Sequence, residues 1–367
     1  MKFFFTSPTF SLSGVNTATA NIALALCEMG HDARILITHP GAIDRSPLPV
    51  SPGLKVESLP SSRFTPAFKR RRMLADFLEK HAPCIYVPGY DFALSGVSER
   101  LSDNIAVLGV MHSDEPVHYD HVKRLGESWN RVIAVSGFLA GEVKRRFPLL
   151  AERVVAIPSG VTVPECPPCR DSDCGPLKIA YAGRLSRYQK RIYDLSKIAH
   201  NLDGRGMRFS LSISGDGPDR RGLEKKFAGL SERAEVKFLG TLENEAVRGL
   251  FRQSHVFLLV SEFEGTPVSL LEAMAEGCTP VVTDLRSGIP ELVENGVTGY
   301  RAPVGKISDF ADRLSILHCD RALLARLSAN AREKISCGPY KIETVARRYI
   351  EEAEKSFAEA RSGAFRR

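Results

Sequence analysis

One segment of this chain constrains its fold more than any other, because it reads as a strand, a loop, a helix and a second strand in immediate succession. The apolar runs Val256–Val260 and Thr279–Val282 predict two buried strands. Between them, Thr266 and Pro267 predict a helix start, with Thr at the N-cap and Pro at the first helical position. Gly277 predicts the end of that helix. The segment is therefore one strand–helix–strand unit of an open α/β sheet.

The loop and the helix of this segment carry two carboxylates. Glu264 follows the first strand, at the edge where open α/β sheets bind ligands, and Glu272 lies on the helix. The helix N-terminus, which comes after Gly265, stabilises an anion through its free N–H groups and its dipole. The segment therefore predicts one place that offers groups for sugar hydroxyls and for a diphosphate. The alternative is a helix that carries ordinary surface glutamates.

The spacing of these glutamates resembles that of the family-four retaining glycosyltransferases of the GT-B fold. The signature of that family is Glu, seven residues, Glu, and then Ala-Met-Ala-x-Gly-x-Pro-Val-Val. Here Glu264 and Glu272 are followed by Ala273-Met-Ala-Glu-Gly277-Cys-Thr-Pro280-Val-Val. The resemblance implies an α/β chain with two Rossmann-like domains, whose parallel sheets face an interdomain cleft.

Length and composition fit this expectation. A chain of 367 residues is long enough for two domains with full cores, and 43% apolar with 25% charged residues is ordinary for a soluble protein. No run of about eighteen apolar residues exists, and the start reads as a strand rather than a secretory signal. Eight irregularly spaced cysteines favour reduced thiols in a cytoplasm. We expect a cytoplasmic protein, with a peripheral position on the inner face of the membrane as an addition.

The net charge of +7, with a pI near 9.0, favours anionic partners. Nucleotide sugars and an anionic membrane surface both qualify. Nucleic acid is not expected, because the chain shows no helix-turn-helix, zinc-finger or aromatic-basic platform.

Strands and helices alternate along the chain. Helices are predicted over Asn16–Met29 and from the N-cap Ser136 to Arg146, and the first strand–helix loop lacks the G-x-G-x-x-G fingerprint of a nicotinamide site. The other predicted strands are Lys2–Thr6, Ala33–Ile37, Ile105–Val110, Arg131–Val135, Val154–Ile157, Lys178–Ala182, Arg208–Ser214 and Glu235–Leu239.

A stretch rich in Pro, Gly, Cys and Asp interrupts this alternation and predicts an interdomain linker. We expect an acceptor domain over residues 1–163, a linker over 164–176 and a nucleotide-sugar-binding domain over 177–340. The family resemblance implies that the last helix, at about 341–367, packs back on the first domain. Cys166, Cys169 and Cys174 offer a zinc or redox motif in the linker, but no fourth ligand is evident and a plain linker is favoured.

A cation pair follows the first strand of the second domain. Gly183 lets the backbone turn tightly, Arg184 presents a planar fork suited to a phosphate, and Lys190 presents a point charge. Such a pair stabilises the charge of a departing nucleoside diphosphate without a metal. The layout resembles the family's Gly-Arg-Leu…Lys-Gly motif, although Arg191 stands where Gly is commoner. We expect that removing either cation cuts turnover severely, by an effect of about 3 kcal/mol, and leaves the fold intact. The alternative is a solvated charge run.

His112 comes at the end of a first-domain strand, in Met111-His112-Ser-Asp114. The resemblance implies that it contacts the donor sugar. Two other interpretations remain: a satisfied core histidine, and a metal site, whose ligands would be His112, Asp114, His118, Asp120 and His121. We expect no metal and no cofactor.

The resemblance implies further donor contacts from loops. Gly14, in Ser13-Gly14, lies where the family often has two glycines near the donor phosphates, and Leu242 ends a loop similar to one that reads the base. Gly265, Thr266, Pro267 and Val268 would surround the donor sugar and phosphate. The turn Gly215-Asp-Gly217-Pro218 is a structural turn or a ligand contact.

A basic helix is predicted in the first domain. It begins near Lys69-Arg-Arg-Arg72 and carries an apolar face formed by Met73, Leu74, Phe77 and Leu78. Such a helix lies on an anionic membrane, or simply exposes a solvated face.

These features together predict a retaining glycosyltransferase that moves a hexosyl unit from a nucleotide-diphosphate sugar, with UDP or GDP favoured, to a glycan or lipid-linked acceptor. The family implies surface polysaccharide or glycolipid synthesis, and attack assisted by the leaving phosphate rather than by a protein base. The predicted catalytic residues are His112, Glu264, Arg184 and Lys190. The alternatives are a GT-B sugar-nucleotide 2-epimerase and a non-catalytic sugar-nucleotide-binding module.

Overall fold

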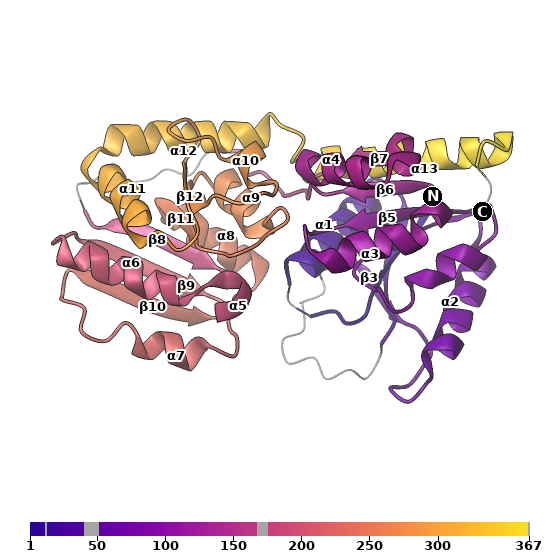
Figure 1. Ribbon diagram of the computed structural model, residues 1–367, viewed down its shortest axis with the longest axis horizontal. Coiled ribbons are helices and arrows are strands. Elements are labelled where there is room, and N and C mark those ends of the chain that lie inside the picture. The colour runs from indigo at the N-terminus through magenta and orange to yellow at the C-terminus, as the bar shows by residue number, and fades with distance from the viewer. Residues whose placement is uncertain (12, 40–50, 167–174, 366–367) are drawn as a thin grey trace. The chain divides into compact units, whose positions relative to one another are not determined.

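A computed structural model describes residues 1–11, 13–39, 51–166 and 175–365 (Figure 1). The chain divides into two compact units, one formed by Met1–Gly160 with Ile342–Arg367 and the other by Val161–Lys341. The expected linker includes residues 167–174, which lie outside the described ranges, as do Cys169 and Cys174. Cys166 is described, exposed and not in a disulfide.

The first unit is built on a parallel sheet. Within its described residues, seven strands pair in the order β3-β2-β1-β4-β5-β6-β7. The strands are β1 Lys2–Ser7, β2 Asp32–Ile37, β3 Lys55–Ser58, β4 Cys84–Pro88, β5 Ile105–Met111, β6 Arg131–Ala134 and β7 Val154–Ala156. Phe3 and Phe4 point to opposite faces of β1 and both are fully buried, so the sheet is covered on both faces.

Helices cover the two faces of this sheet. They are α1 Gly14–Glu28, α2 Ala67–His81, α3 Pro116–Leu125, α4 Gly137–Arg146 and α13 Ile342–Ser362, with 3-10 turns η1 Ser95–Arg100, η2 Gly126–Ser128 and η3 Pro148–Arg153. Two serines cap helices: Ser13 accepts from Asn16 N at 3.2 Å, and Ser136 accepts from Leu139 N at 3.1 Å. Gly14 is therefore the first residue of a helix, not part of the preceding loop, because its neighbour Ser13 provides the cap.

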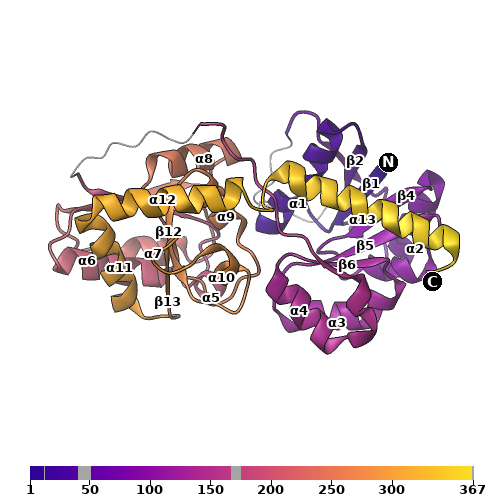
Figure 2. The same ribbon diagram turned by 90° about the horizontal axis from the view of Figure 1, so that it is seen from above.

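The last helix, α13, belongs to this first unit. It packs against α1 and β5, and Figure 2 shows it crossing over β5 and β6. Arg131, at the start of β6, holds it by ion pairs to Glu352 at 2.7 Å and to Glu359 at 2.6 Å. The Arg131 side chain is 6% exposed, so this contact is part of the interior.

The second unit is built on another parallel sheet. Its described part has six strands in the order β10-β9-β8-β11-β12-β13. The strands are β8 Leu177–Ala182, β9 Phe209–Ser214, β10 Ala234–Gly240, β11 Val256–Leu259, β12 Thr279–Thr283 and β13 Tyr300–Ala302. The helices are α5 Arg187–Lys190, α6 Tyr193–Gly204, α7 Arg220–Lys225, α8 Asn244–Gln253, α9 Val268–Ala275, α10 Ile289–Leu292, α11 Ile307–Cys319 and α12 Arg321–Ser336.

The predicted α/β class with two parallel sheets is confirmed. The helix after Glu264 begins later than predicted: Pro267 occupies the N-cap, and Val268 is the first helical residue. The reason is that Pro267 has an extended backbone, with ψ at 119°, so Thr266 is not the cap. The helix ends at Ala275 with Glu276 as its C-cap, and Gly277 follows with φ at +77°, the left-handed geometry that glycine accepts most easily.

In the described part of the chain, none of the helices is long and apolar enough to cross a membrane.

Candidate functional site

Glu264 lies in the loop between β11 and α9, where it forms a buried ion pair. Its Oε1 accepts from Lys190 Nζ at 2.5 Å and from Ser261 Oγ at 2.5 Å, and Glu264 is only 8% exposed. Lys190 is the last residue of the short helix α5. The structure thus brings together two of the predicted catalytic residues, which are 74 positions apart in sequence.

Hydrogen bonds to backbone groups fix the two loops that carry this pair. Glu262 N donates to Gln189 O at 2.8 Å, and Gln189 Nε2 donates to the carbonyl of Phe263 at 3.4 Å. On the other side, the Gly265 carbonyl accepts from Gly288 N at 3.0 Å. Contacts within the protein therefore set the position of the carboxylate.

Arg191 explains how the chain departs from the family's Lys-Gly pattern. Its φ is +45°, in the left-handed region that favours glycine, and it is the one non-glycine residue with positive φ in the described ranges. Its guanidinium forms ion pairs with Asp194 at 2.8 Å and with Glu262 at 2.6 Å. The backbone shape of a glycine is therefore retained, and the side chain adds a link between α5 and the Glu264 loop.

Arg184 lies in a loop whose backbone is shaped by the Gly215–Gly217 turn. A Cβ on Gly215 would lie 2.0 Å from the carbonyl oxygen of Gly183, and a Cβ on Gly217 would lie 2.4 Å from that of Leu185. These glycines therefore allow close approach of two loops, which assigns them a structural role. The Arg184 side chain is exposed and forms no ion pair with any residue that the structure describes.

Glu272 is buried on α9, and its Oε1 lacks a hydrogen-bond partner among the described residues. It is 8% exposed, and no described group bonds its Oε1. Burial raises the pKa of this carboxyl to about 7. Its helix neighbour Glu276 is paired instead, with Arg248 at 2.8 Å and Arg252 at 3.0 Å. Glu272 is thus the carboxyl of this helix that has hydrogen-bonding capacity to offer a ligand.

The remaining predicted donor contacts of the second unit fall around these groups. Gly265, Thr266, Pro267 and Val268 follow Glu264 directly and lead into α9. Leu242 is half-buried, two residues after the end of β10, and no contact in the described structure ties it to Glu264.

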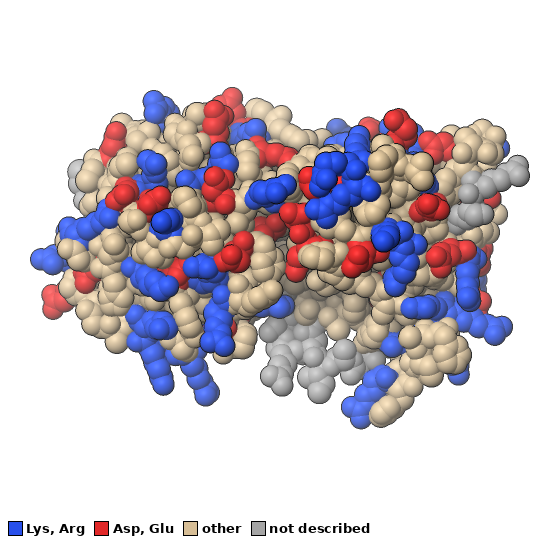
Figure 3. Space-filling view, in the orientation of Figure 1, with Lys and Arg blue, Asp and Glu red and all other residues tan. Residues whose placement is uncertain are grey.

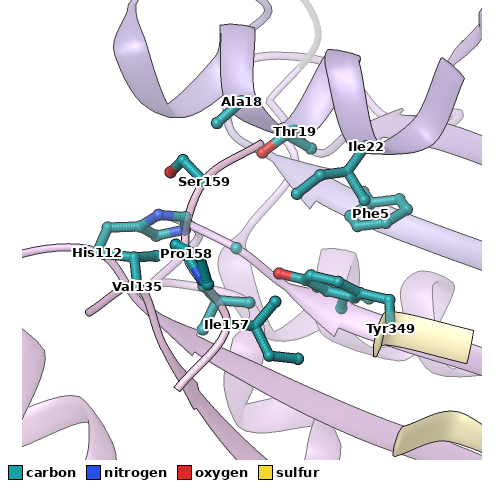
Figure 4. A pocket seen from close by; sticks show the side chains of 13 residues that line it. Phe5, Ala18, Thr19, Ile22, His112, Val135, Ile157, Pro158, Ser159 and Tyr349 are labelled. Atoms are coloured by element: carbon teal, nitrogen blue, oxygen red, sulfur yellow. The ribbon is translucent and has the colours of Figure 1, made fainter. Parts of the chain in front are cut away.

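His112 lies in the first unit, directly after β5, beside a small cavity. The cavity holds about 20 Å³ of accessible space, and Figure 4 shows His112, Ser159, Thr19 and Tyr349 around it. His112 Nε2 is buried and has no described partner, and burial lowers the pKa of the ring to about 3. The imidazole is therefore neutral, with one nitrogen that can donate and one that can accept.

The histidines after β5 do not form the metal site considered as an alternative. His118 packs against Phe92 with ring centroids 5.1 Å apart, and His121 Nε2 lies 2.5 Å from Ser95 Oγ. Tyr119 donates to Asp114. No group of three metal-binding side chains gathers anywhere in residues 1–11, 13–39, 51–166 or 175–365. Aromatic packing and a hydrogen bond account for the positions of His118 and His121.

Two further contacts were not predicted. Ser261 supplies a hydrogen bond to Glu264, and no sequence pattern marks it beyond its place three residues earlier. Tyr188 is 78% exposed and packs edge-on against Phe263, with ring centroids 5.6 Å apart.

The apolar face that the sequence predicts on the basic helix α2 is not available to a membrane as a whole. Leu74 and Leu78 are fully buried, because α2 packs them into the core of the first unit.

Comparison with known proteins identifies the family of this chain. The Glycosyltransferase Family 4 model matches residues 12–163, and the Glycosyl transferases group 1 model matches residues 171–334. The putative colanic acid biosynthesis glycosyltransferase WcaL of Salmonella typhimurium is 32% identical over 168 residues, which is 44% of this chain and 41% of WcaL. The amylovoran biosynthesis glycosyltransferase AmsK of Erwinia amylovora is 33% identical over 172 residues, 45% of this chain and 42% of AmsK. These alignments thus span about two-fifths of each relative.

Solved structures match over the whole chain. A variant of S. aureus TarM, in complex with Fondaparinux, alpha-GlcNAc-glycerol and UDP, has a TM-score of 0.79 and 14% identity, covering 96% of this chain and 100% of that one. Sucrose-phosphate synthase from Thermosynechococcus elongatus has a TM-score of 0.77 and 18% identity, covering 98% and 99%. At these identities the likeness shows the fold, which is GT-B with two Rossmann-like domains. With a family model matched in each half, this chain belongs to the group 1 glycosyltransferases.

Proposed function

We propose that this protein is a retaining glycosyltransferase that moves a hexosyl unit from a UDP or GDP sugar to a glycan or lipid-linked acceptor. The observation that carries the proposal is the Lys190–Glu264 pair at the carboxyl end of β11, beside the N-terminus of α9. Two relatives are named for colanic acid biosynthesis and amylovoran biosynthesis, which supports a role in making surface polysaccharide or glycolipid.

The diphosphate of the donor is assigned to Arg184 and Lys190. Arg184 is exposed and unpaired among the described residues, so its fork is available for a phosphate. Lys190 has three N–H donors and uses one on Glu264, which leaves two for phosphate oxygens. As the glycosidic bond to the phosphate breaks, negative charge grows on the departing oxygens, and these two cations stabilise it.

The sugar and the ribose are assigned to carboxyl groups. Glu264 accepts hydrogen bonds from the hydroxyls of the transferred sugar, and the N–H groups after Gly265 contact the sugar and phosphate. Glu272 accepts from the ribose hydroxyls, because its Oε1 is buried with no other described partner. On the acceptor-binding unit, the neutral ring of His112 exchanges hydrogen bonds with a donor-sugar hydroxyl, and Gly14 gives the first helix N-terminus close approach to the phosphates. Leu242 contacts the base.

No protein group is assigned as general base. In the proposed reaction the acceptor hydroxyl attacks from the face that the diphosphate leaves, and the leaving phosphate oxygen takes its proton. The bond between the anomeric carbon and the phosphate breaks while the bond to the acceptor oxygen forms, so the anomeric configuration is retained.

The test begins with donor binding. Thermal shifts with UDP, GDP, ADP and TDP sugars should identify one nucleotide that raises the melting temperature. Arg184→Ala should abolish that shift, whereas Arg187→Ala, three positions away on the same surface and 73% exposed, should keep it. An unchanged shift in Arg184→Ala would place the diphosphate elsewhere.

The second stage follows the sugar. NMR of the reaction mixture should show a glycoside with the donor's anomeric configuration, and only when acceptor is present. An epimerised sugar formed without acceptor would establish the 2-epimerase instead, and donor binding with no product would establish a non-catalytic module.

A further inference from the structure

Two phenylalanines at the start of α2 are exposed to a degree that is unusual for aromatic side chains. Phe64 is 79% exposed and Phe68 is 75% exposed. They are four positions apart, with Phe64 in the turn before the helix and Phe68 in its first turn. Large apolar side chains gathered on a surface mark an interaction site.

The turn that carries Phe64 is ordered by its own hydrogen bonds. Thr65 N donates to Ser62 O at 3.0 Å, Ser62 N donates to Thr65 Oγ1 at 3.0 Å, and Phe64 N donates to Ser62 Oγ at 3.3 Å. The helix that follows is anchored in the core by Leu74 and Leu78, both fully buried. The two rings are therefore displayed by a fixed scaffold, and folding does not hide them.

The same end of the helix is strongly basic. Residues 58–75 contain five Lys or Arg and no Asp or Glu. Arg63, Lys69 and Arg72 are exposed and form no ion pair with any described residue, and the Arg63 guanidinium lies 4.7 Å from the centre of the Phe64 ring. Figure 3 shows Lys or Arg side chains on the surface around the lower end of α2.

We propose that this end of α2, formed by Phe64 and Phe68 with Arg63, Lys69 and Arg72, docks the protein on an anionic lipid bilayer. The rings enter the region between headgroups and acyl chains, where aromatic side chains are favoured, and the cations pair with lipid phosphates. Neither the insertion of the rings nor the attraction of the cations holds a protein firmly by itself, and the two together give reversible binding. The proposal is independent of the glycosyltransferase activity.

Charge complementarity selects this occupant. A second copy of the chain would bring the same uncompensated positive charge to the contact, and like charges oppose that association. Another basic segment of this unit, Lys144–Arg146 on α4, differs because Arg145 and Arg146 are paired with Glu142 at 2.8 and 3.1 Å. Leu149, three positions after Arg146, is 88% exposed, which makes it a control for an exposed apolar side chain outside the proposed docking surface.

The test is sedimentation of the full chain with vesicles, without sugar donor. Wild type should bind vesicles of equal parts phosphatidylglycerol and phosphatidylcholine, and should not bind pure phosphatidylcholine. Replacing Arg63, Lys69 and Arg72 by Gln should weaken binding about five-fold per residue, or about a hundred-fold together, and should remove the salt dependence. The double variant Phe64→Ser with Phe68→Ser should weaken binding at least about ten-fold. The remaining binding of this variant should still depend on salt, because its cations are unchanged.

The controls separate this surface from general stickiness. Leu149→Ser should bind as wild type does, and all variants should keep the wild-type melting temperature because the changed side chains are exposed. Phe64→Trp should show a blue-shifted emission on the mixed vesicles, since the only other tryptophan, Trp129, is fully buried. Absence of wild-type binding at low salt, or equal binding by the double Phe variant, would overturn the proposal.

Discussion

Replacing Lys190 by Met should destabilise the second unit, because it leaves the carboxylate of Glu264 buried without its cation. The Glu264 side chain is 7% exposed and the two charged atoms are 2.5 Å apart. Removing one partner of a buried pair costs about 3–5 kcal/mol. We expect the lower end, about 3 kcal/mol, since Ser261 still donates to the same oxygen and the Lys190 side chain is 15% exposed. Methionine keeps the length of the side chain, so packing loss is small.

A double-mutant cycle isolates the ion pair. Glu264→Gln removes the buried charge, so adding it to Lys190→Met should recover about 2 kcal/mol of the loss. Arg184→Ala, on the same loop but exposed and unpaired among described residues, should change the free energy of unfolding by less than about 0.5 kcal/mol. The sequence alone predicts that replacing either Lys190 or Arg184 leaves stability unchanged. A loss of stability in Lys190→Met but not in Arg184→Ala would therefore support the buried ion pair over the prediction from sequence.

The assay is urea unfolding followed by far-UV circular dichroism. Tryptophan fluorescence is unsuitable, because Trp129 lies in the first unit and reports on that unit. If Lys190→Met unfolds with the wild-type free energy, or if the two single changes add without coupling, the pair is not a stabilising contact in solution. The assigned position of Lys190 would then be wrong.

Three further outcomes follow from the same region. The carboxyl of Glu272 has a pKa of about 7 in the folded protein against an ordinary 4.5, so the folded state holds a proton that the unfolded state loses. The free energy of unfolding should therefore fall as pH rises between these two values. Glu272→Gln should remove this pH dependence when urea unfolding is compared at about pH 5 and about pH 8. Arg191→Gly should be more stable than Arg191→Ala by about 1 kcal/mol in the same assay, because both lose the ion pairs and only glycine accepts φ at +45°. Transferase activity should survive excess EDTA, since two cations and a helix N-terminus neutralise the diphosphate; full loss that manganese restores would contradict the assigned site.

Sequence reasoning located the strands that carry long apolar runs, and missed three others for different reasons. β3, Lys55–Ser58, and β13, Tyr300–Ala302, are short edge strands, and so few residues show no period. β4, Cys84–Pro88, is central and fully buried, and its apolar run bounded by prolines was a usable signal. β3 and β13 are too short for a hydrophobic pattern to predict them, whereas β4 could have been predicted from its apolar run.

At the site, sequence located the groups but not their partners. The Glu264 spacing and the Arg184–Lys190 loop could be identified from motifs, because each is contiguous in the chain. The ion pair between Lys190 and Glu264 joins residues 74 positions apart, and only the sheet order places β8 beside β11. The buried state of Glu272 likewise depends on packing, so its raised pKa has no counterpart in the sequence.

The departure at Arg191 shows how a pattern can break without loss of the geometry behind it. Lys190 precedes the left-handed residue directly, so the direction of its side chain depends on that turn. Arg191 keeps the turn and ties it to Glu262, while Gln189 bonds the same loop through its carbonyl. Together with the Lys190–Glu264 pair, these contacts join the cation loop to the carboxylate loop. In the proposed reaction, a cation held in this way does not have to reorganise when charge develops on the diphosphate, and this is the condition under which a cation lowers the barrier most.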